Sequence, residues 1–376
     1  MSNDMQSSSG DGSVPLKDVE KELSRHMDAV KEPGEGPVLL ARLSNLLIFT
    51  DNAETAQAIT NEVPTIVETH PARVILLLAE PGPPDEEVRG FVTAWCRRWG
   101  LRQHICSEQV TLKCRGRNAE DLPYAVLSLL VGDLPTNLWW ASTIPPPLAG
   151  PLLLQLSETA QQVIYDSNGW RDPARGVAAT SSWLKKFELP PGQGRWRVAS
   201  DLNWRRLKYW RRILGQTLDP GTAPGALESI SEVQIEHGPH AVVQAWELAS
   251  WLASRLGWKV QTARVQPGVE IAWQFLTAHG PVKIKIRRHP EGQTTIRHVR
   301  VICKLHDKPA TYDFAAEENR RISVTLAGSD SAPRTLTLQS QTLAELVGRQ
   351  VSDRERDPVF QESMSVAQAL AQSVLA

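Results

Sequence analysis

The stretch Gly132-Asp133-Leu134-Pro135-Thr136-Asn137-Leu138-Trp139-Trp140-Ala141 decides the fold class. It is a short apolar run bounded by turn residues, which is typical of a buried strand. Pro145-Pro146-Pro147 follows and cannot stay in a sheet, because proline lacks the N–H that a ladder needs. Neighbouring strand residues point to opposite faces, so Trp139 and Trp140 need cover on both sides. This predicts a central strand in a sheet that carries helices on both faces.

Alternating strands and helices extend on both sides of this stretch. Before it, a strand-like run over residues 43–49, a helix over 53–69 and an apolar strand over 73–79 make one βαβ unit. After it, strands are expected at 162–165 and around 196–199, each followed by a helix. The pattern predicts an α/β domain with a mostly parallel sheet over residues 37–218.

Two segments inside this domain depart from simple alternation. Residues 86–99 and 101–115 are expected to form an antiparallel hairpin at the sheet edge, although 86–99 could equally be helical. A helix is expected over 118–130. A helix that starts at Asp201 carries an apolar face and an opposite basic face.

A second domain is expected after the linker at 219–225, which is rich in proline and glycine. Residues 226–376 show an amphipathic helix, several short strand-like runs and two final helices. This predicts a smaller α+β domain with an antiparallel sheet. At the other end, residues 1–36 are expected to be a disordered N-terminus followed by an arm helix.

The composition is that of an ordinary globular protein, with 41% hydrophobic and 22% charged residues and a net charge of -1. There is no global charge to attract nucleic acid or an anionic membrane, so neither is expected as a partner. No apolar run approaches the ~20 residues that span a bilayer. The N-terminus lacks a basic region followed by an apolar one, so a cytoplasmic location is expected.

The four cysteines show no CxxC pair, so the spacing of zinc ligands is absent and no metal is expected. In a cytosolic chain the default expectation is buried, reduced thiols. Cys96 and Cys106 flank a turn at Trp99-Gly100, so they could approach each other across a hairpin. A redox-active pair is therefore the alternative for these two residues.

The usual catalytic motifs are missing from the sequence. There is no GxGxxG, no GxxxxGK[ST], no HExxH and no GxSxG, so neither a cofactor nor a catalytic residue is predicted. Asp166 ends a predicted parallel strand beside Ser167, where a catalytic residue could lie. The competing interpretation is that Asp166 turns the chain before Asn168-Gly169. An α/β domain without a phosphate loop or nucleophile is more consistent with binding than with catalysis.

The helix from Asp201 places Arg205, Lys208 and Arg212 on one side at steps of three and four. Such a basic stripe is either a solvated helix face or a docking surface for an acidic partner or a phosphate-bearing ligand. The 13 tryptophans, against 4 tyrosines and 6 phenylalanines, raise the expectation of a protein–protein interface.

Several motifs together resemble the OpcA-type glucose-6-phosphate dehydrogenase assembly proteins. They are Asp133-Leu134-Pro135, Leu138-Trp139-Trp140, the Pro145-Pro146-Pro147 loop, Asp166-Ser167, and Asp201-Leu202-Asn203-Trp204-Arg205-Arg206-Leu207 with Trp210-Arg211. Each motif is weak alone and specific in combination. The same order of elements runs from the first strand of the α/β domain to the linker, so the resemblance covers most of the chain.

The resemblance implies a non-catalytic assembly factor and allosteric activator of glucose-6-phosphate dehydrogenase, in the oxidative pentose phosphate pathway. The alternative is an enzyme or sensor acting on a phosphorylated sugar or nucleotide in the α/β domain. For the partner surface we expect the strand end with its proline loop and the basic stripe. The candidate contact residues are Trp139, Trp140, Pro145, Pro146, Arg205, Lys208 and Arg212.

Overall fold

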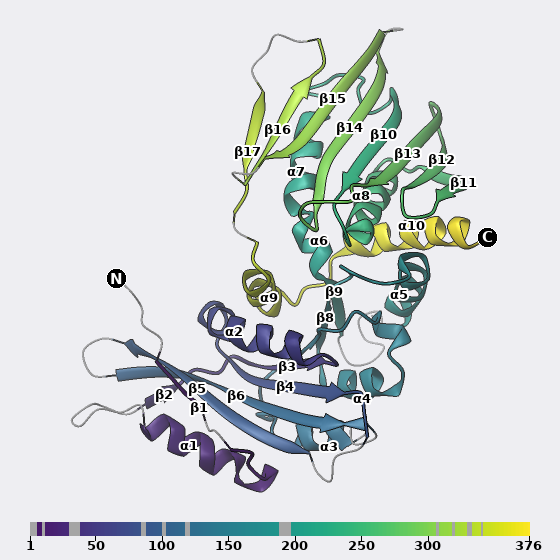
Figure 1. The fold of residues 1–376 in the computed structure, drawn as a ribbon. Coiled ribbons are helices and arrows are strands. Elements are labelled where there is room, and N and C mark those ends of the chain that lie inside the picture. Colours follow the sequence, from purple (N-terminus) through teal and green to yellow (C-terminus); the bar gives the residue numbers. More distant parts are fainter. Residues whose placement is uncertain are drawn as a thin grey trace.

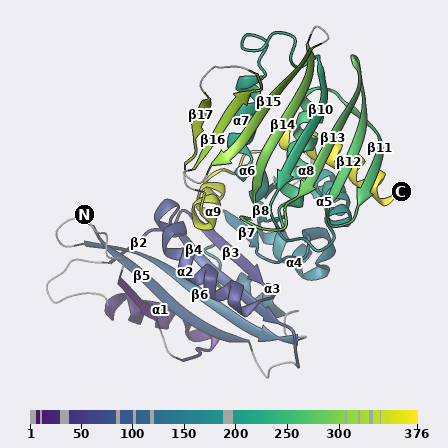
Figure 2. The same cartoon turned by 45° about the horizontal axis from the view of Figure 1, so that its top comes forward.

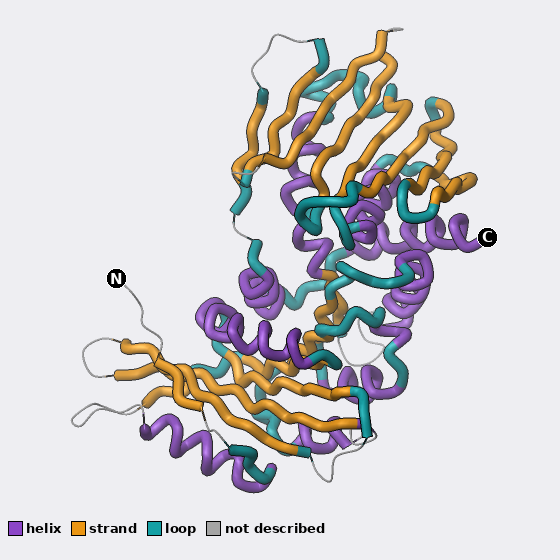
Figure 3. The backbone as a smooth tube through the Cα atoms, viewed as in Figure 1, coloured by secondary structure: helices purple, strands orange, loops and turns teal. Residues whose placement is uncertain are grey.

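Two β-sheets organise the chain, and helices pack on both of them (Figures 1 and 3). The computed structural model describes residues 6–9, 12–29, 38–83, 88–99, 103–116, 121–187, 197–305, 308–317, 320–328, 333–339 and 341–376. Among these residues, no helix has both the length and the apolar character that crossing a membrane requires.

The first sheet, sheet A, has the strand order β1-β5-β6-β4-β3-β7-β8-β9, with β2 beside β6. Its strands are β1 (Gln6–Ser9), β2 (Val38–Leu40), β3 (Ser44–Thr50), β4 (Ala72–Glu80), β5 (Arg89–Trp99), β6 (Gln103–Arg115), β7 (Thr136–Trp140), β8 (Gln162–Tyr165) and β9 (Val198–Asp201). All neighbours from β6 to β9 are parallel, whereas β5 and β1 run antiparallel at one edge. Taken in chain order, β6-β4-β3-β7-β8-β9 is the doubly wound order 3-2-1-4-5-6.

Helices cover both faces of sheet A, as the central β7 requires. One face packs against α1 (Val19–Ala29), α3 (Leu122–Leu127) and α4 (Pro151–Thr159). The other packs against α2 (Ala53–Thr69) and α9 (Leu343–Ser352). Alternate strand residues divide between the two apolar cores, so Trp140 belongs to the first and Trp139 to the second. The predicted α/β fold is confirmed.

The second sheet, sheet B, has the order β11-β12-β13-β10-β14-β15-β16-β17. Its strands are β10 (Ile230–His237), β11 (Lys259–Gln266), β12 (Glu270–Thr277), β13 (Gly280–Arg288), β14 (Ile296–Leu305), β15 (Lys308–Glu317), β16 (Arg321–Leu326) and β17 (Arg334–Thr337). The sheet is antiparallel, as predicted, except that β10 and β13 pair in parallel. Helices α8 (Val242–Arg255) and α10 (Pro358–Leu375) lie behind it in Figure 2.

The C-terminal helices join the two parts of the molecule. Helix α9 returns to the first part and packs on α2, where a Cβ at Gly348 would lie only 3.0 Å from Cβ of Thr69. Helix α10 packs against both α8 and α5 (Pro173–Phe187), as Figure 1 shows. The segment expected as a linker at 219–225 forms turns whose Ala223 is buried.

The structure differs from the sequence-based expectations at several elements. The helix expected over 118–130 is limited to α3. The antiparallel hairpin expected over 86–99 and 101–115 is confirmed, because residues 89–99 form strand β5 against β6. The arm helix α1 buries Val19 and Leu23 against sheet A, and the preceding residues 6–9 pair with β5 as a strand. These N-terminal elements therefore belong to the sheet A layer.

The helix expected from Asp201 is broken into α6 (Leu202–Arg206) and α7 (Lys208–Thr217). The break is at Leu207, whose ψ of -6° departs from α-helical geometry. Its N–H still bonds to the carbonyl of Asn203, so the chain turns without losing its backbone partners.

Candidate functional site

The predicted contact residues in β7 are enclosed by the protein. Trp139 and Trp140 are each 2% exposed. The Trp140 ring stacks on Phe49 with 4.2 Å between centroids, and its indole N–H donates to the carbonyl of Ile144 at 3.0 Å. This bond fixes the start of the proline loop against the end of the strand. Both tryptophans serve the core of the folded chain.

The proline loop beyond β7 is only partly accessible. Pro145 and Pro146 are buried, whereas Ile144 and Leu148 are 43% and 40% exposed. The loop thus presents aliphatic side chains to solvent on either side of its buried prolines. These two residues were not among the sequence-based candidates.

The strand order of sheet A reverses between β3 and β7, and doubly wound sheets bind ligands beyond the strand ends at such a point. A cavity of about 450 Å³ lies beside this point, at the ends of β3, β4 and β6. It is lined by Asp51, Asn52, Ala53, Glu54, Glu80, Pro81, Pro83 and Arg115. Arg115 is 3.7 Å from the Glu80 carboxylate. Asp51 and Glu54 add two further carboxylates, so the cavity is lined by three acidic side chains and one basic one.

The residues of this crevice do not fit a dinucleotide. The turn after β3 contains no glycine, although close approach of the backbone to a pyrophosphate depends on glycine. The Asn52 side chain caps α2 by accepting the N–H of Thr55 at 2.8 Å, which occupies the helix start. Asp51 and Glu54 add negative charge where a pyrophosphate would lie. The site therefore repels the ligand that this sheet order usually binds.

A polar network lies at the ends of β8 and β9, one strand further along. Asp201 is 2% exposed and caps α6 by accepting the N–H of Asn203 at 2.8 Å. It also accepts the N–H of Ser167 at 3.2 Å, and the Asn203 side chain donates to the Ser167 hydroxyl at 2.8 Å. The motif residues after the two strands thus hold each other in place.

Asp166 has a structural role in this network. Its Oδ1 accepts the N–H of Asn168 at 3.1 Å, which is the turn predicted from the sequence. Arg206 donates to both carboxylate oxygens, at 2.8 Å each. Asp166 is therefore engaged on both oxygens within the chain.

A second carboxyl faces Asp201 from the part of the molecule that carries sheet B. Glu247 of α8 is 2% exposed. Burial, followed by the charge of Asp166, raises the pKa of Asp201 to about 7. Burial, followed by the charge of Asp201, raises the pKa of Glu247 well above its ordinary range. The two carboxyls therefore share at least one proton at neutral pH, and they couple the two parts electrostatically.

The predicted basic stripe is divided by the break at Leu207. Arg205 on α6 donates to Gln350 at 2.7 Å and to the Asp353 carboxylate at 2.6 Å, so it binds the end of α9. Lys208 and Arg212 on α7 are exposed. Of the three stripe residues, these two present their charge to solvent.

A cavity of about 400 Å³ adjoins the stripe. Arg205, Lys208 and Arg211 line it together with Asp201 and Asp353. The guanidinium carbon of Arg211 lies 3.4 Å from the ring centroid of Trp204, which is a cation–π contact. Burial lowers the pKa of Arg211 to about 10, but it stays charged at neutral pH.

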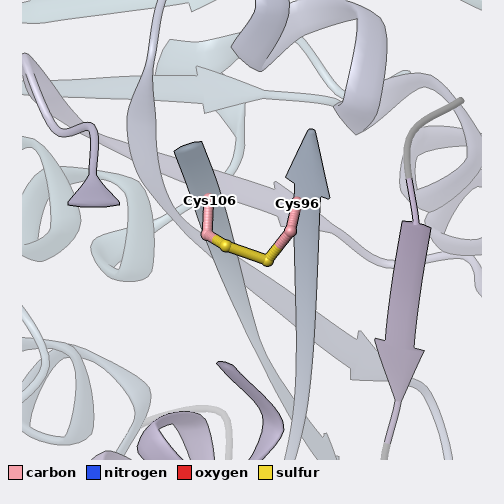
Figure 4. Close-up of a disulfide and its surroundings, with 2 residues drawn as sticks. All are labelled: Cys96 and Cys106. Atoms are coloured by element: carbon pink, nitrogen blue, oxygen red, sulfur yellow. A yellow bond between two sulfur atoms is a disulfide. The ribbon is translucent and has the colours of Figure 1, made fainter. Parts of the chain in front are cut away.

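Cys96 and Cys106 are joined by a disulfide, which corrects the default expectation of reduced thiols (Figure 4). They lie directly opposite each other on β5 and β6, so the predicted hairpin brings them together. Both are buried, at 1% and 0% exposure. Cys114 and Cys303 are buried thiols outside this disulfide. Within the described ranges, no group of three or more His, Cys, Asp or Glu residues could hold a metal ion.

One surface hollow was not anticipated. It has a volume of about 860 Å³ and includes Gly132–Thr136, the first half of the stretch that decides the fold. Tyr124 and Leu127 of α3 line it and are 72% and 56% exposed. Their three-residue spacing on a helix was the available signal, but it does not distinguish an exposed face from a buried one.

The fold and the crevice define a class of protein. The chain has the sheet order of dinucleotide-binding proteins, with acidic side chains in place of the phosphate-binding turn. Residues 63–182 match the family described as glucose-6-phosphate dehydrogenase subunit N-terminal domain, and residues 197–364 match the corresponding C-terminal domain. The chain belongs to the OpcA-type glucose-6-phosphate dehydrogenase assembly proteins, which confirms the resemblance seen in its motifs.

Two cyanobacterial relatives carry the name "Putative OxPP cycle protein OpcA". The protein of Synechocystis sp. is 27% identical over 82% of this chain, and that of Nostoc punctiforme is 31% identical over 53%. The chain spans 65% of the length of the first and 41% of the second. Among solved structures, an oxidoreductase from Sinorhizobium meliloti aligns with a TM-score of 0.50 and 11% identity, covering 89% of this chain and 97% of that one. That likeness concerns the fold alone.

Proposed function

We propose that this protein is a non-catalytic assembly factor and allosteric activator of glucose-6-phosphate dehydrogenase in the oxidative pentose phosphate pathway. Membership of the OpcA family supports this function. The observation that carries the non-catalytic part is the crevice at the end of β3, where Asp51 and Glu54 replace a phosphate-binding turn. A cytoplasmic location belongs to the same proposal, as does a division into an α/β unit over 37–218 and an α+β unit over 226–376.

Activation requires that the protein bind the active form of the dehydrogenase more tightly than the inactive form, because only differential affinity shifts an equilibrium. A ten-fold shift corresponds to roughly 1.4 kcal/mol of differential binding. A few desolvated contacts at an interface supply a free energy of that size.

For the contact surface we propose the exposed charges of α7 and the exposed part of the proline loop. Lys208 and Arg212 lie one turn apart on α7 and are accessible. Ile144 and Leu148 provide apolar area close to the buried proline pair. Trp140 fixes the start of this loop through its bond to Ile144, and Trp139 packs in the core on the other face of sheet A. Neither tryptophan needs to touch the partner.

Kinetics of a purified glucose-6-phosphate dehydrogenase test the function. Its rate is measured against substrate concentration with and without this protein, and this protein is also assayed alone. We expect a lower half-saturating substrate concentration and a larger oligomer in the mixture, with no turnover by this protein alone. Binding without any change in kinetics would reduce the role to that of a scaffold. Turnover of a phosphorylated sugar or nucleotide by this protein alone would favour the enzymatic alternative.

A charge-reversal variant tests the surface. Lys208→Glu combined with Arg212→Glu should abolish activation and weaken capture of the dehydrogenase. The matched control is Lys259→Glu combined with Arg264→Glu, which reverses two exposed charges on β11. Arg205 is left unchanged, because its loss would release α9 and confuse binding with folding. Equal activation by both double variants would exclude the α7 surface from the interface.

A further inference from the structure

A separate pocket lies where the starts of α5 and α8 meet the hairpin of β11 and β12. Its volume is about 390 Å³. In Figure 1 helix α10 lies between this hairpin and α5, and α10 supplies Val374 to the lining. The residues that matter here are Trp170, His237, Val242, Trp246, Ile271 and Arg288. Residues from the part that carries sheet A and from the part that carries sheet B therefore line the pocket.

Two buried hydrogen-bond donors in this lining lack a partner in the part of the chain that the structure describes. Trp170 is 5% exposed and Trp246 is fully buried. The indole N–H of each lacks an acceptor among the described residues. Buried donors are almost always paired, because leaving one unpaired forfeits its hydration. Among the described residues of this lining, the unpaired buried side-chain groups are thus donors and not acceptors.

The start of α8 adds further donors at the same place. Its N-cap is Ala241, which has no side chain able to accept a hydrogen bond, and its first turn carries no acidic residue. The first N–H groups of this 14-residue helix therefore have no side-chain acceptor, and the positive end of the helix dipole is uncompensated. His240 just before it has a φ of 62°, a conformation that residues other than glycine seldom adopt. Such strain is typical of functional sites.

The charges around the pocket favour an anion. Arg171 and Arg288 are exposed at its rim and have no carboxylate partner among the described residues. The two carboxylates of the lining are already engaged. Asp172 accepts the N–H of Arg175 at 3.0 Å, and Glu270 pairs with Arg287 at 3.2 Å. The side chains of Arg171 and Arg288 are thus available to bind an anionic ligand.

Much of the remaining lining is apolar. It includes the two tryptophan rings with Val242, Val265, Ile271 and Ile286, beside the polar Gln266 and His240. His237 is 3% exposed and bonds through Nδ1 to the Gly238 carbonyl at 2.8 Å, and burial lowers its pKa, so it stays neutral. An apolar cavity with a few convergent donors is the usual form of a small-molecule site.

We propose that this pocket binds a small organic anion, with its phosphate or carboxylate head at the start of α8 and a flat apolar body against Val242, Val265 and Ile271. The head would accept from the first N–H groups of α8 and pair with Arg288. The pocket is distinct from the switch-point crevice and from the α7 surface. The inference is independent of the proposed function, since binding is measured without the dehydrogenase.

Calorimetry with the full chain tests the site, with phenyl phosphate and benzoate as probes and benzyl alcohol as the uncharged control. We expect saturable binding of one or both anions at one site per chain, and none of the alcohol. Equal binding of benzyl alcohol, or no binding of either anion at millimolar concentration, would overturn the proposal.

Two variants locate the bound anion. Val242→Asp places a carboxylate in the first turn of α8, where it favours the helix but repels an anion, so affinity should fall roughly ten-fold or more. Arg288→Ala should weaken binding without affecting the core, because Arg288 is exposed. The matched control, Ala53→Asp, adds a carboxylate to the first turn of α2 and should leave binding unchanged. Unaltered affinity in both Val242→Asp and Arg288→Ala would show that the anion binds elsewhere.

Discussion

Arg206 holds both carboxylate oxygens of Asp166 at 2.8 Å, from a helix that begins at the end of the neighbouring strand. This two-bond pair ties the turn after β8 to the helix after β9. The pair lies at the end of β8, where an enzyme with this strand order could carry a catalytic group. In this chain that position stabilises the fold.

Replacing Arg206 by Lys should therefore destabilise the protein although the charge is kept. Lysine offers a point charge and cannot match both oxygens at once. We expect a loss of about 1–3 kcal/mol in the free energy of unfolding, measured by urea denaturation. Arg297→Lys, at an exposed arginine of β14, is the control and should change little. A loss no larger than that of the control would mean that the two-bond geometry contributes nothing.

The buried pair of Asp201 and Glu247 predicts an unusual dependence of stability on pH. Both pKa values are raised by burial in the folded chain, that of Asp201 from 3.8 to about 7. Between about pH 4 and about pH 7 the folded state therefore binds more protons than the unfolded state. The contribution of this pair to the free energy of unfolding then falls as the pH rises from about 4 to about 7. Below the unfolded pKa its contribution is fully present.

The variant Glu247→Gln replaces one titrating carboxyl by an amide that does not titrate. The amide N–H can donate a hydrogen bond to Asp201. The variant should be more stable than the wild type, and its advantage should grow as the pH rises to about 7, reaching about 1–3 kcal/mol. Groups that titrate in the same way in both proteins cancel when the two free energies of unfolding are subtracted. The exposed Glu228→Gln is the control. An advantage that stays flat or shrinks between pH 5 and 8 would contradict the raised pKa values.

The elements of the fold follow from local patterns in the sequence. The helix expected over 53–69 is α2, and the strand expected over 162–165 is β8, each with the same ends. The two adjacent tryptophans correctly required cover on both faces of β7. These successes depend on periodicity and capping, which act over a few residues.

Contacts between distant parts of the chain could not be predicted in this way. The amphipathic pattern of α9 indicated a helix but not that it would pack on α2. Glu247 was one polar residue in a helix, and only the fold brings it to Asp201. The basic stripe was predicted on one helix, but that helix breaks at Leu207 into α6 and α7. No local signal showed that Arg205 would be engaged by Asp353.

That ion pair gives a further prediction. Arg205→Ala removes the bonds to Gln350 and Asp353, which hold the end of α9 near β9. Because Asp353 is half exposed, the loss in unfolding free energy should be modest, about 1 kcal/mol. Amide exchange should quicken in α9 while α10 is unaffected. Exchange that is unchanged in α9 would show that packing on α2 alone fixes this helix.

The disulfide between Cys96 and Cys106 should make the stability of sheet A sensitive to reductant. The two residues are 10 apart in sequence, so the bond closes a short loop and should contribute about 2–3 kcal/mol through the entropy of the unfolded chain. Reduction should lower the free energy of unfolding by that amount. A variant with both Cys96→Ala and Cys106→Ala should match the reduced protein and no longer respond to reductant.

Thiol alkylation followed by mass measurement distinguishes the two redox states, and Cys114→Ser is the control because Cys114 is a buried thiol outside the bond. If this pair is also redox-active in function, activation of glucose-6-phosphate dehydrogenase should differ between the oxidised and reduced protein. The double alanine variant should then lose that difference. Equal stability of the oxidised and reduced wild type would show that the backbone pairing of β5 and β6 positions the two sulfurs without help from the bond between them.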